Sequence, residues 1–166
     1  MTRNCIPTPI HVDGVVYLMS GFMSSAVQAI RLGGAKGDIT DDDHVLWERR
    51  RGCPYTPSGL VYDGYVYFLF ANSGRVTCLD AKTGKPYYSG KRLRGLRTVY
   101  SSPVGAAGHV YITGRKGRTK VIKLGQEFEQ VADNRLDDTI DGSPAIAGDE
   151  IYMRGRKHLY CIAEQE

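Results

Sequence analysis

Positively charged residues gather in four short clusters that could bind an acidic ligand or an acidic surface of another molecule. The clusters are Arg49-Arg50-Arg51, Lys91-Arg92-Leu93-Arg94, Arg115-Lys116-Gly117-Arg118 and Arg154-Gly155-Arg156-Lys157. Each cluster falls at an expected strand end, where long cationic side chains also reach solvent without binding anything. Both interpretations, a solvated rim and a surface for an acidic ligand, stay open at this point.

Patterns that would indicate a metal centre or an enzyme are missing from the sequence. Asp41-Asp42-Asp43 lacks the alternating ligands and the glycine of a calcium loop, so we expect an exposed acidic turn and no metal. The sequence has no nucleophile elbow, phosphate loop or His-Glu-x-x-His. The histidines lie in separate segments without ligand spacing, and we expect no zinc site: His11, His44, His109 and His158. We therefore assign no catalytic residue and find no positive sign of an enzyme.

The composition is that of a globular protein made of short strands. The 166 residues are 42% hydrophobic and 24% charged, with eleven Tyr, 20 Gly and 7 Pro. The net charge of +4 is spread along the chain, so we expect no nucleic-acid partner. No apolar stretch approaches the roughly 20 residues of a membrane span, and residues 1–7 show no signal-peptide core.

The four cysteines do not form a recognisable redox or metal pattern. They are Cys5, Cys53, Cys78 and Cys161, and no Cys-x-x-Cys occurs. Cys78 and Cys161 occupy one equivalent strand position in the repeat described next. We expect them to be buried small hydrophobic residues rather than a disulfide or a ligand pair.

One phrase recurs four times: an apolar stretch, a turn containing Gly, and an apolar-Tyr pair that opens a second strand. The copies are the hairpins 9–17, 59–67, 103–111 and 144–152. Asp13-Gly14 and Asp63-Gly64 supply the positive φ that tight hairpin turns require. The anchoring tyrosines are 50, 44 and 41 residues apart, which suits a four-stranded unit of ~40 to 50 residues.

A third strand follows every hairpin, and an outer strand follows three of them, which we expect at Val45 to Arg49, Lys85 to Leu93 and Glu127 to Ala132. Four-stranded units of this kind pack face to face around an axis. The sequence therefore predicts one all-β domain, residues 1–166, made of four-stranded antiparallel blades of a β-propeller. The blades span about 6–50, 56–94, 99–136 and 141–166, or about three and a half blades. We expect a partial or half ring that a second copy or further blades complete.

The segment from Cys78 to Tyr88 resembles the blade signature Ala-x-Asp-x-x-Thr-Gly-x-x-x-Trp of the pyrroloquinoline-quinone (PQQ)-type propellers. Cys78 replaces the Ala and Tyr88 replaces the Trp, while Trp47 ends a similar motif that a long insertion interrupts. The motif residues with an expected structural role are Asp80, Thr83, Gly84, Tyr88 and Trp47. Thr-Gly is expected to make a turn, and the aromatic ring to pack on the neighbouring blade.

PQQ-type repeats occur in quinoprotein dehydrogenases, in the propeller of bacterial outer-membrane assembly, and in a non-catalytic branch that binds no quinone. The end of the chain looks most like that last branch, which implies a scaffold that binds a protein or polymer ligand and a periplasmic or extracytoplasmic location. Dehydrogenases of this type need calcium ligands, a vicinal cysteine pair and a stacking Trp, and this set is not assembled here. We expect no cofactor; PQQ and calcium belong to the alternative, a fragment of a quinoprotein oxidoreductase whose active site lies outside this chain.

Ligands of propellers bind at the rim and the central channel, which the loops between strands surround. We look for binding residues between fourth and first strands and between second and third strands. Charged and aromatic residues on those loops give four predicted ligand-binding residues: Arg51, Tyr55, Arg97 and Tyr100.

Overall fold

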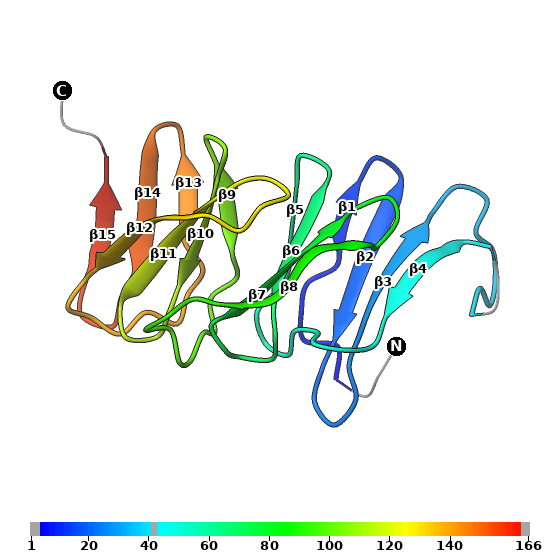
Figure 1. The fold of residues 1–166 in the computed structure, drawn as a ribbon, viewed down its shortest axis with the longest axis horizontal. Helices are drawn as coiled ribbons and strands as arrows, with labels where there is room; N and C mark the ends of the chain where they lie inside the picture. Colours follow the sequence, from blue (N-terminus) through cyan, green and yellow to red (C-terminus); the bar gives the residue numbers. More distant parts are fainter. Residues whose placement is uncertain (1–3, 41–42, 164–166) are drawn as a thin grey trace.

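The chain folds into short antiparallel β-sheets, as the computed structural model of residues 4–40 and 43–163 shows (Figure 1). Within those residues there are three four-stranded sheets and one three-stranded sheet, each with its strands in chain order. We call them blades 1 to 4. The four blades do not close into a ring, because blades 1 and 4 lie at opposite ends of the molecule in Figure 1. This confirms the predicted all-β partial propeller of about three and a half blades.

Blades 1 to 3 run from a short inner strand to an outer fourth strand, and the described part of blade 4 has three strands. Blade 1 contains β1 (Ile10–Val12), β2 (Val15–Ser20), β3 (Ala26–Arg31) and β4 (Val45–Arg49). Blade 2 contains β5 (Leu60–Tyr62), β6 (Tyr65–Leu69), β7 (Arg75–Asp80) and β8 (Pro86–Arg92). Blade 3 contains β9 (Val104–Ala106), β10 (His109–Thr113), β11 (Arg118–Lys123) and β12 (Gln130–Arg135). Blade 4 contains β13 (Ala145–Ala147), β14 (Glu150–Arg154) and β15 (Leu159–Ile162).

The repeated tyrosine has the same register in every blade. Tyr67 pairs with Leu60 on the inner strand and with Cys78 on the third strand, and Tyr152 likewise pairs with Ala145 and Cys161. Asp63 and Gly64 both have positive φ in the β5–β6 turn, at 49° and 78°. A two-residue turn of this kind fixes the register of the hairpin, so one sequence phrase repeats one geometry.

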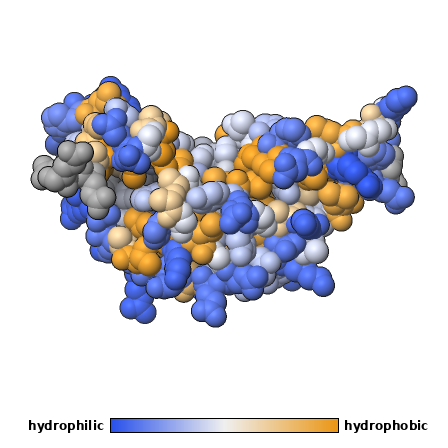
Figure 2. Space-filling model, turned by 90° about the horizontal axis from the view of Figure 1, so that it is seen from above, coloured by the Kyte–Doolittle hydropathy of each residue, from blue (hydrophilic) through white to orange (hydrophobic). Residues whose placement is uncertain are grey.

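The blades pack face to face and form an open arc that is hollowed on one side (Figure 2). The core therefore lies between blades rather than inside any one of them. Tyr17, Met19 and Val27 of blade 1 pack with Val66 and Phe68 of blade 2 in one buried cluster. A second cluster joins blades 2 and 3.

Trp47 links blade 1 to blade 2. Its Nε1 donates a hydrogen bond of 2.9 Å to the carbonyl of Ala81, which also accepts the Tyr17 hydroxyl at 3.2 Å. The indole lies against Gly84, where an added Cβ would stand 2.6 Å from Cδ2. Tyr88 has the same register in blade 2 and meets Phe128 of blade 3 edge to face, with ring centroids 5.6 Å apart.

Asp80 organises the turn on which Trp47 rests. Its Oδ1 accepts the backbone N–H and the hydroxyl of Thr83, at 2.7 and 2.8 Å, and its Oδ2 accepts the Tyr87 hydroxyl at 2.9 Å. Gly84 then turns the chain with φ +68°. The hydrogen bonds from Thr83, and then from Tyr87, lower the pKa of Asp80, so the carboxylate stays charged and keeps the turn in place.

A ladder of hydroxyl groups joins the blades beside their inner strands. The backbone N–H of Thr8 donates to Ser58 Oγ at 2.9 Å, that of Ser58 to Ser102 Oγ at 3.0 Å, and that of Ser102 to Ser143 Oγ at 2.8 Å. These four residues stand at equivalent positions just before the inner strands. The same bond thus repeats at each of the three junctions between blades, and we call the set the serine ladder.

Two expectations from the sequence need correction. The outer strand of blade 3 spans Gln130–Arg135, three residues later than Glu127 to Ala132, because Phe128 packs on Tyr88 instead of extending the strand. Cys161 does share the register of Cys78, but it is exposed, whereas Cys78 is fully buried. Blade 3 covers the face of blade 2 on which Cys78 lies, and no described blade covers the corresponding face of blade 4.

Candidate binding surface

The two edges of the arc differ in what they carry. One edge holds the tight turns between first and second strands and the links between third and fourth strands. The other holds the loops between second and third strands and the connections from one blade to the next, at the bottom of Figure 1. We call this second edge the loop edge. The four residues predicted to bind a ligand all belong to connections on it.

The structure distributes these four residues over separate places. Arg51 lies in a shallow hollow with Glu48, and Tyr55 lines a second hollow. Arg97 lines a third, whereas Tyr100 lies under the guanidinium of Arg115, 5.2 Å from the ring centroid. They do not form one site, so their role in binding stays a prediction.

Tyr55 belongs to an apolar hollow of about 230 Å³ between blades 1 and 2. Phe22 stacks on Tyr55 with ring centroids 5.5 Å apart, yet 56% of Phe22 remains exposed. Its neighbour Met23 is 84% exposed, and Phe70 on the β6–β7 loop adds a third exposed apolar side chain. Apolar groups gathered in this way on a loop mark a surface that a partner can cover.

The backbone presents Phe22 and Met23 outward at an energetic cost. Their φ angles are 68° and 64°, a region that costs a non-glycine residue roughly 1–2 kcal/mol. Gly21 lets this loop approach the next connection, since a Cβ there would lie 2.4 Å from the carbonyl oxygen of Pro54. Strained backbone of this kind clusters at functional sites in proteins.

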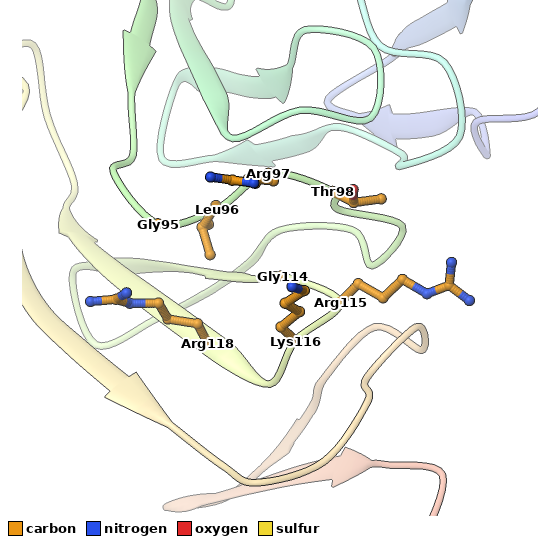
Figure 3. A pocket seen from close by; sticks show the side chains of 8 residues that line it. All are labelled: Gly95, Leu96, Arg97, Thr98, Gly114, Arg115, Lys116 and Arg118. Atoms are coloured by element: carbon orange, nitrogen blue, oxygen red, sulfur yellow. The ribbon is translucent and has the colours of Figure 1, made fainter.

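A basic pocket of about 220 Å³ lies farther along the loop edge, between blades 2 and 3 (Figure 3). The connection Gly95 to Thr98 and the loop Gly114 to Arg118 form its walls. Arg118 holds Asp133 through two nitrogens at 2.6 and 2.5 Å, and buried Lys120 holds the same carboxylate at 2.6 Å. Hydrogen bonds from Arg118, and then Lys120, lower the pKa of Asp133 far below its usual range.

Asp138 fastens the next connection along the same edge. Its carboxylate accepts backbone N–H groups of Thr139, Lys157 and His158 at 2.7 to 3.2 Å, and the Tyr160 hydroxyl at 3.2 Å. Burial alone would raise the pKa of Asp138, but these hydrogen bonds outweigh it and bring the pKa to about 2. Asp138 therefore positions the loop edge and is not free to accept a proton from a substrate.

No cluster of metal-ligating side chains occurs in the part of the chain that the structure describes. Those residues contain no group of three or more His, Cys, Asp or Glu that could hold an ion, and Asp41 and Asp42 lie outside them. Burial raises the pKa of the Cys78 thiol to about 11 and also raises that of Cys53, so neither thiol is activated as a nucleophile. Within the same residues no helix is long and apolar enough to cross a membrane.

Sequence reasoning passed over Phe22, Met23 and Asp138. An apolar pair directly after Gly21, at the end of an alternating strand, was the available signal for the first two. Asp138 follows Asp137 in a segment that reads as an ordinary acidic loop, and its role depends on the fold. Arg115, Lys116 and Arg118 did appear among the basic clusters, without a pocket to join them.

Antiparallel blades, with the Trp47 ring of blade 1 resting on the Thr83-Gly84 turn of blade 2, are typical of an open propeller of PQQ-type repeats. The model of the PQQ_2 family, described as outer membrane protein assembly factor BamB, matches residues 3–166. The chain belongs to this family. No curated protein sequence matches it.

Solved structures share the fold at low sequence identity. The computationally designed protein Ika4 is 12% identical with a TM-score of 0.74, over 98% of this chain and 93% of that one. Ika8, also designed, is 11% identical with a TM-score of 0.69, over 94% of this chain and 45% of that one. Quinohemoprotein alcohol dehydrogenase from Comamonas testosteroni is 20% identical with a TM-score of 0.64, over 92% of this chain and 29% of that one. The chain thus spans under half of Ika8 and under a third of the dehydrogenase.

Proposed function

We propose that this chain is a non-catalytic β-propeller scaffold whose loop edge binds a protein partner. The observation that carries this function is the group of exposed Phe22, Met23 and Phe70 around half-buried Tyr55, because it displays apolar surface beside a strained loop. Protein interfaces typically centre on aromatic and Met side chains with cations nearby. Arg50 and Arg51 supply such cations on the adjoining connection.

The family description supports a protein rather than a polymer as the ligand, since it names an assembly factor of the outer membrane. The same description supports a periplasmic or other extracytoplasmic location for the chain. Protein binding of this kind needs neither PQQ nor calcium.

We also propose that further blades, from a second copy or from other propeller sequence, cover the outward faces of blades 1 and 4. Leu159 and Cys161 of blade 4 occupy the register of Val76 and Cys78, which are fully buried between blades 2 and 3. Leu159 is 67% exposed, and Leu46 is 40% exposed on blade 1. Faces that bury such positions elsewhere in the same chain are suited to another blade.

Capture of partners by matched variants tests the binding function. In one variant, Phe22→Asn and Met23→Asn remove the apolar side chains but keep a residue that tolerates positive φ. In the control, Leu32→Asn changes a 48% exposed apolar residue on the opposite edge. Quantitative mass spectrometry should show proteins retained by wild type and control and lost from the double variant.

Two results would contradict this function. One is equal retention of the same proteins by the double variant. The other is reduction of an artificial electron acceptor by the purified protein when PQQ, Ca²⁺ and an alcohol are supplied.

A further inference from the structure

The basic pocket between blades 2 and 3 holds more positive charge than its neighbours neutralise. Four of its eight lining residues are cationic and none is acidic. Arg115 pairs with Asp141 at 3.1 Å and Arg118 pairs with Asp133. Arg97 and Lys116 form no ion pair with any described residue, so two positive charges face the pocket without a counter-charge.

The paired arginines are held rigidly. Arg118 rests on Gly95, where an added Cβ would lie 2.6 Å from Nη1, while Asp133 holds its other nitrogens. Arg115 is held between Asp141 and the Tyr100 ring. Figure 3 shows Arg97 and Arg118 extending toward one side of the pocket and Arg115 toward the other, with Lys116 between them. Arg115 and Arg118 therefore form fixed, already paired walls, and Arg97 and Lys116 are the cations left to pair with an anion.

The pocket also has an apolar part. Leu96 forms one wall and packs closely on Gly74 and Gly114, where added Cβ atoms would lie 2.5 and 2.7 Å from its side chain. A ligand that combines a carboxylate with methylene groups fits such a lining better than a bare inorganic anion. Aspartate and glutamate side chains have this combination, and arginine pairs well with carboxylates.

Asn72 links the connection beside the apolar hollow to the connection beside the basic pocket. Phe70 and Ala71 line that hollow, and the next residue, Asn72, reaches both connections. Its side chain accepts the Thr56 N–H at 3.0 Å, and its carbonyl accepts the Val99 N–H at 2.9 Å, one residue beyond the pocket. The two connections are thus held to each other through one residue on the same edge of the arc.

We infer that the basic pocket binds an acidic peptide segment, through Asp or Glu side chains held by Arg97 and Lys116. This rests on the proposed function, because the segment would belong to the protein partner that covers the loop edge. The same charge would also attract inorganic phosphate, which the experiment separates from a peptide.

Fluorescence anisotropy with a labelled hexaglutamate peptide tests this site on the whole chain. Substituting Arg97→Ser and Lys116→Ser should weaken binding about tenfold or more, since both unpaired cations are lost. The control pair Lys82→Ser and Lys85→Ser removes the same charge from exposed positions on the opposite edge and should change affinity less than about twofold. Unlabelled hexaglutamine should not compete, and phosphate should compete only at far higher concentration than hexaglutamate.

Equal weakening by the control pair would show binding to net charge and overturn the site. Competition by phosphate at the concentration of hexaglutamate would overturn the peptide assignment. Retained peptide binding in the Phe22→Asn, Met23→Asn variant, together with unchanged partner capture, would count against the proposed function alone. Loss of partner capture in that variant, with no effect of Arg97 and Lys116 on the peptide, would count against the pocket alone.

Discussion

Gly84 is the residue on which Trp47 of the neighbouring blade rests, and two properties of glycine are used there at once. Its φ of +68° disfavours any side chain, and the space above it is filled by the indole. Gly64 has a similar φ of +78° in the same blade, with nothing within 4 Å of an added Cβ. Comparing substitutions at Gly84 and Gly64 therefore separates the cost of backbone strain, present at both, from the cost of packing against Trp47, present only at Gly84.

Substituting Gly84→Ala should destabilise the protein by about 2–4 kcal/mol, through strain plus overpacking against the indole. Gly64→Ala should cost only about 1–2 kcal/mol, because strain acts alone. Urea unfolding followed by Trp fluorescence measures both, since Trp47 is the only tryptophan. Equal losses in the two variants would show that the contact between Trp47 and Gly84 adds nothing.

Asp138 makes stability depend on pH. Its folded pKa of about 2 lies below the ordinary Asp value of about 3.9, so its contribution is complete above that value and is lost as pH falls toward 2. The difference in unfolding midpoint between wild type and Asp138→Asn should be constant above pH ~5 and shrink between pH ~4 and 2. The exposed Asp149→Asn serves as the control and should show no such change. A wild-type advantage that is as large at pH 2 as at neutral pH would refute this role.

At the scale of strands and turns, repetition made much of the fold predictable. Asp13-Gly14 and Asp63-Gly64 predicted two hairpin turns, and the recurring tyrosine predicted the register of the strands. Both features depend on local backbone chemistry, which the sequence shows directly. The outer strand of blade 3 was misplaced because Phe128 is used for a contact with another blade, which no local pattern reveals. The positive φ of Phe22 and Met23 could not be predicted from the sequence, because neither residue type favours that region.

The serine ladder joins elements that lie 41 to 50 residues apart. Ser102 has two roles in it, since its Oγ accepts the Ser58 N–H and its N–H donates to Ser143. Replacing Ser102 by Ala removes the hydroxyl that accepts the partly buried N–H of Ser58. The N–H is left without a partner, and the change should destabilise the protein by about 1 kcal/mol. Ser24→Ala on an exposed loop is the control, and equal unfolding midpoints for the two variants would argue against the ladder.

For the whole molecule, the open arc leaves two blade faces exposed, and the serine ladder stops at Thr8 and Ser143. If a second copy covers these faces, light scattering should give twice the mass of 18.4 kDa, with the mass reduced by Leu159→Lys. A like-charged exposed control, Gln126→Lys, should leave the mass unchanged. A strictly monomeric protein that does not aggregate would contradict coverage by a second copy.

Whether the loop edge is the surface that holds a protein is the central question. Photo-crosslinking in cells answers it directly, with benzoylphenylalanine placed at Phe22 on the loop edge or at Leu32 on the opposite edge. We expect a discrete covalent adduct with another protein from position 22 and none from position 32. Adducts from position 32 alone, or from neither position, would contradict a protein-binding loop edge.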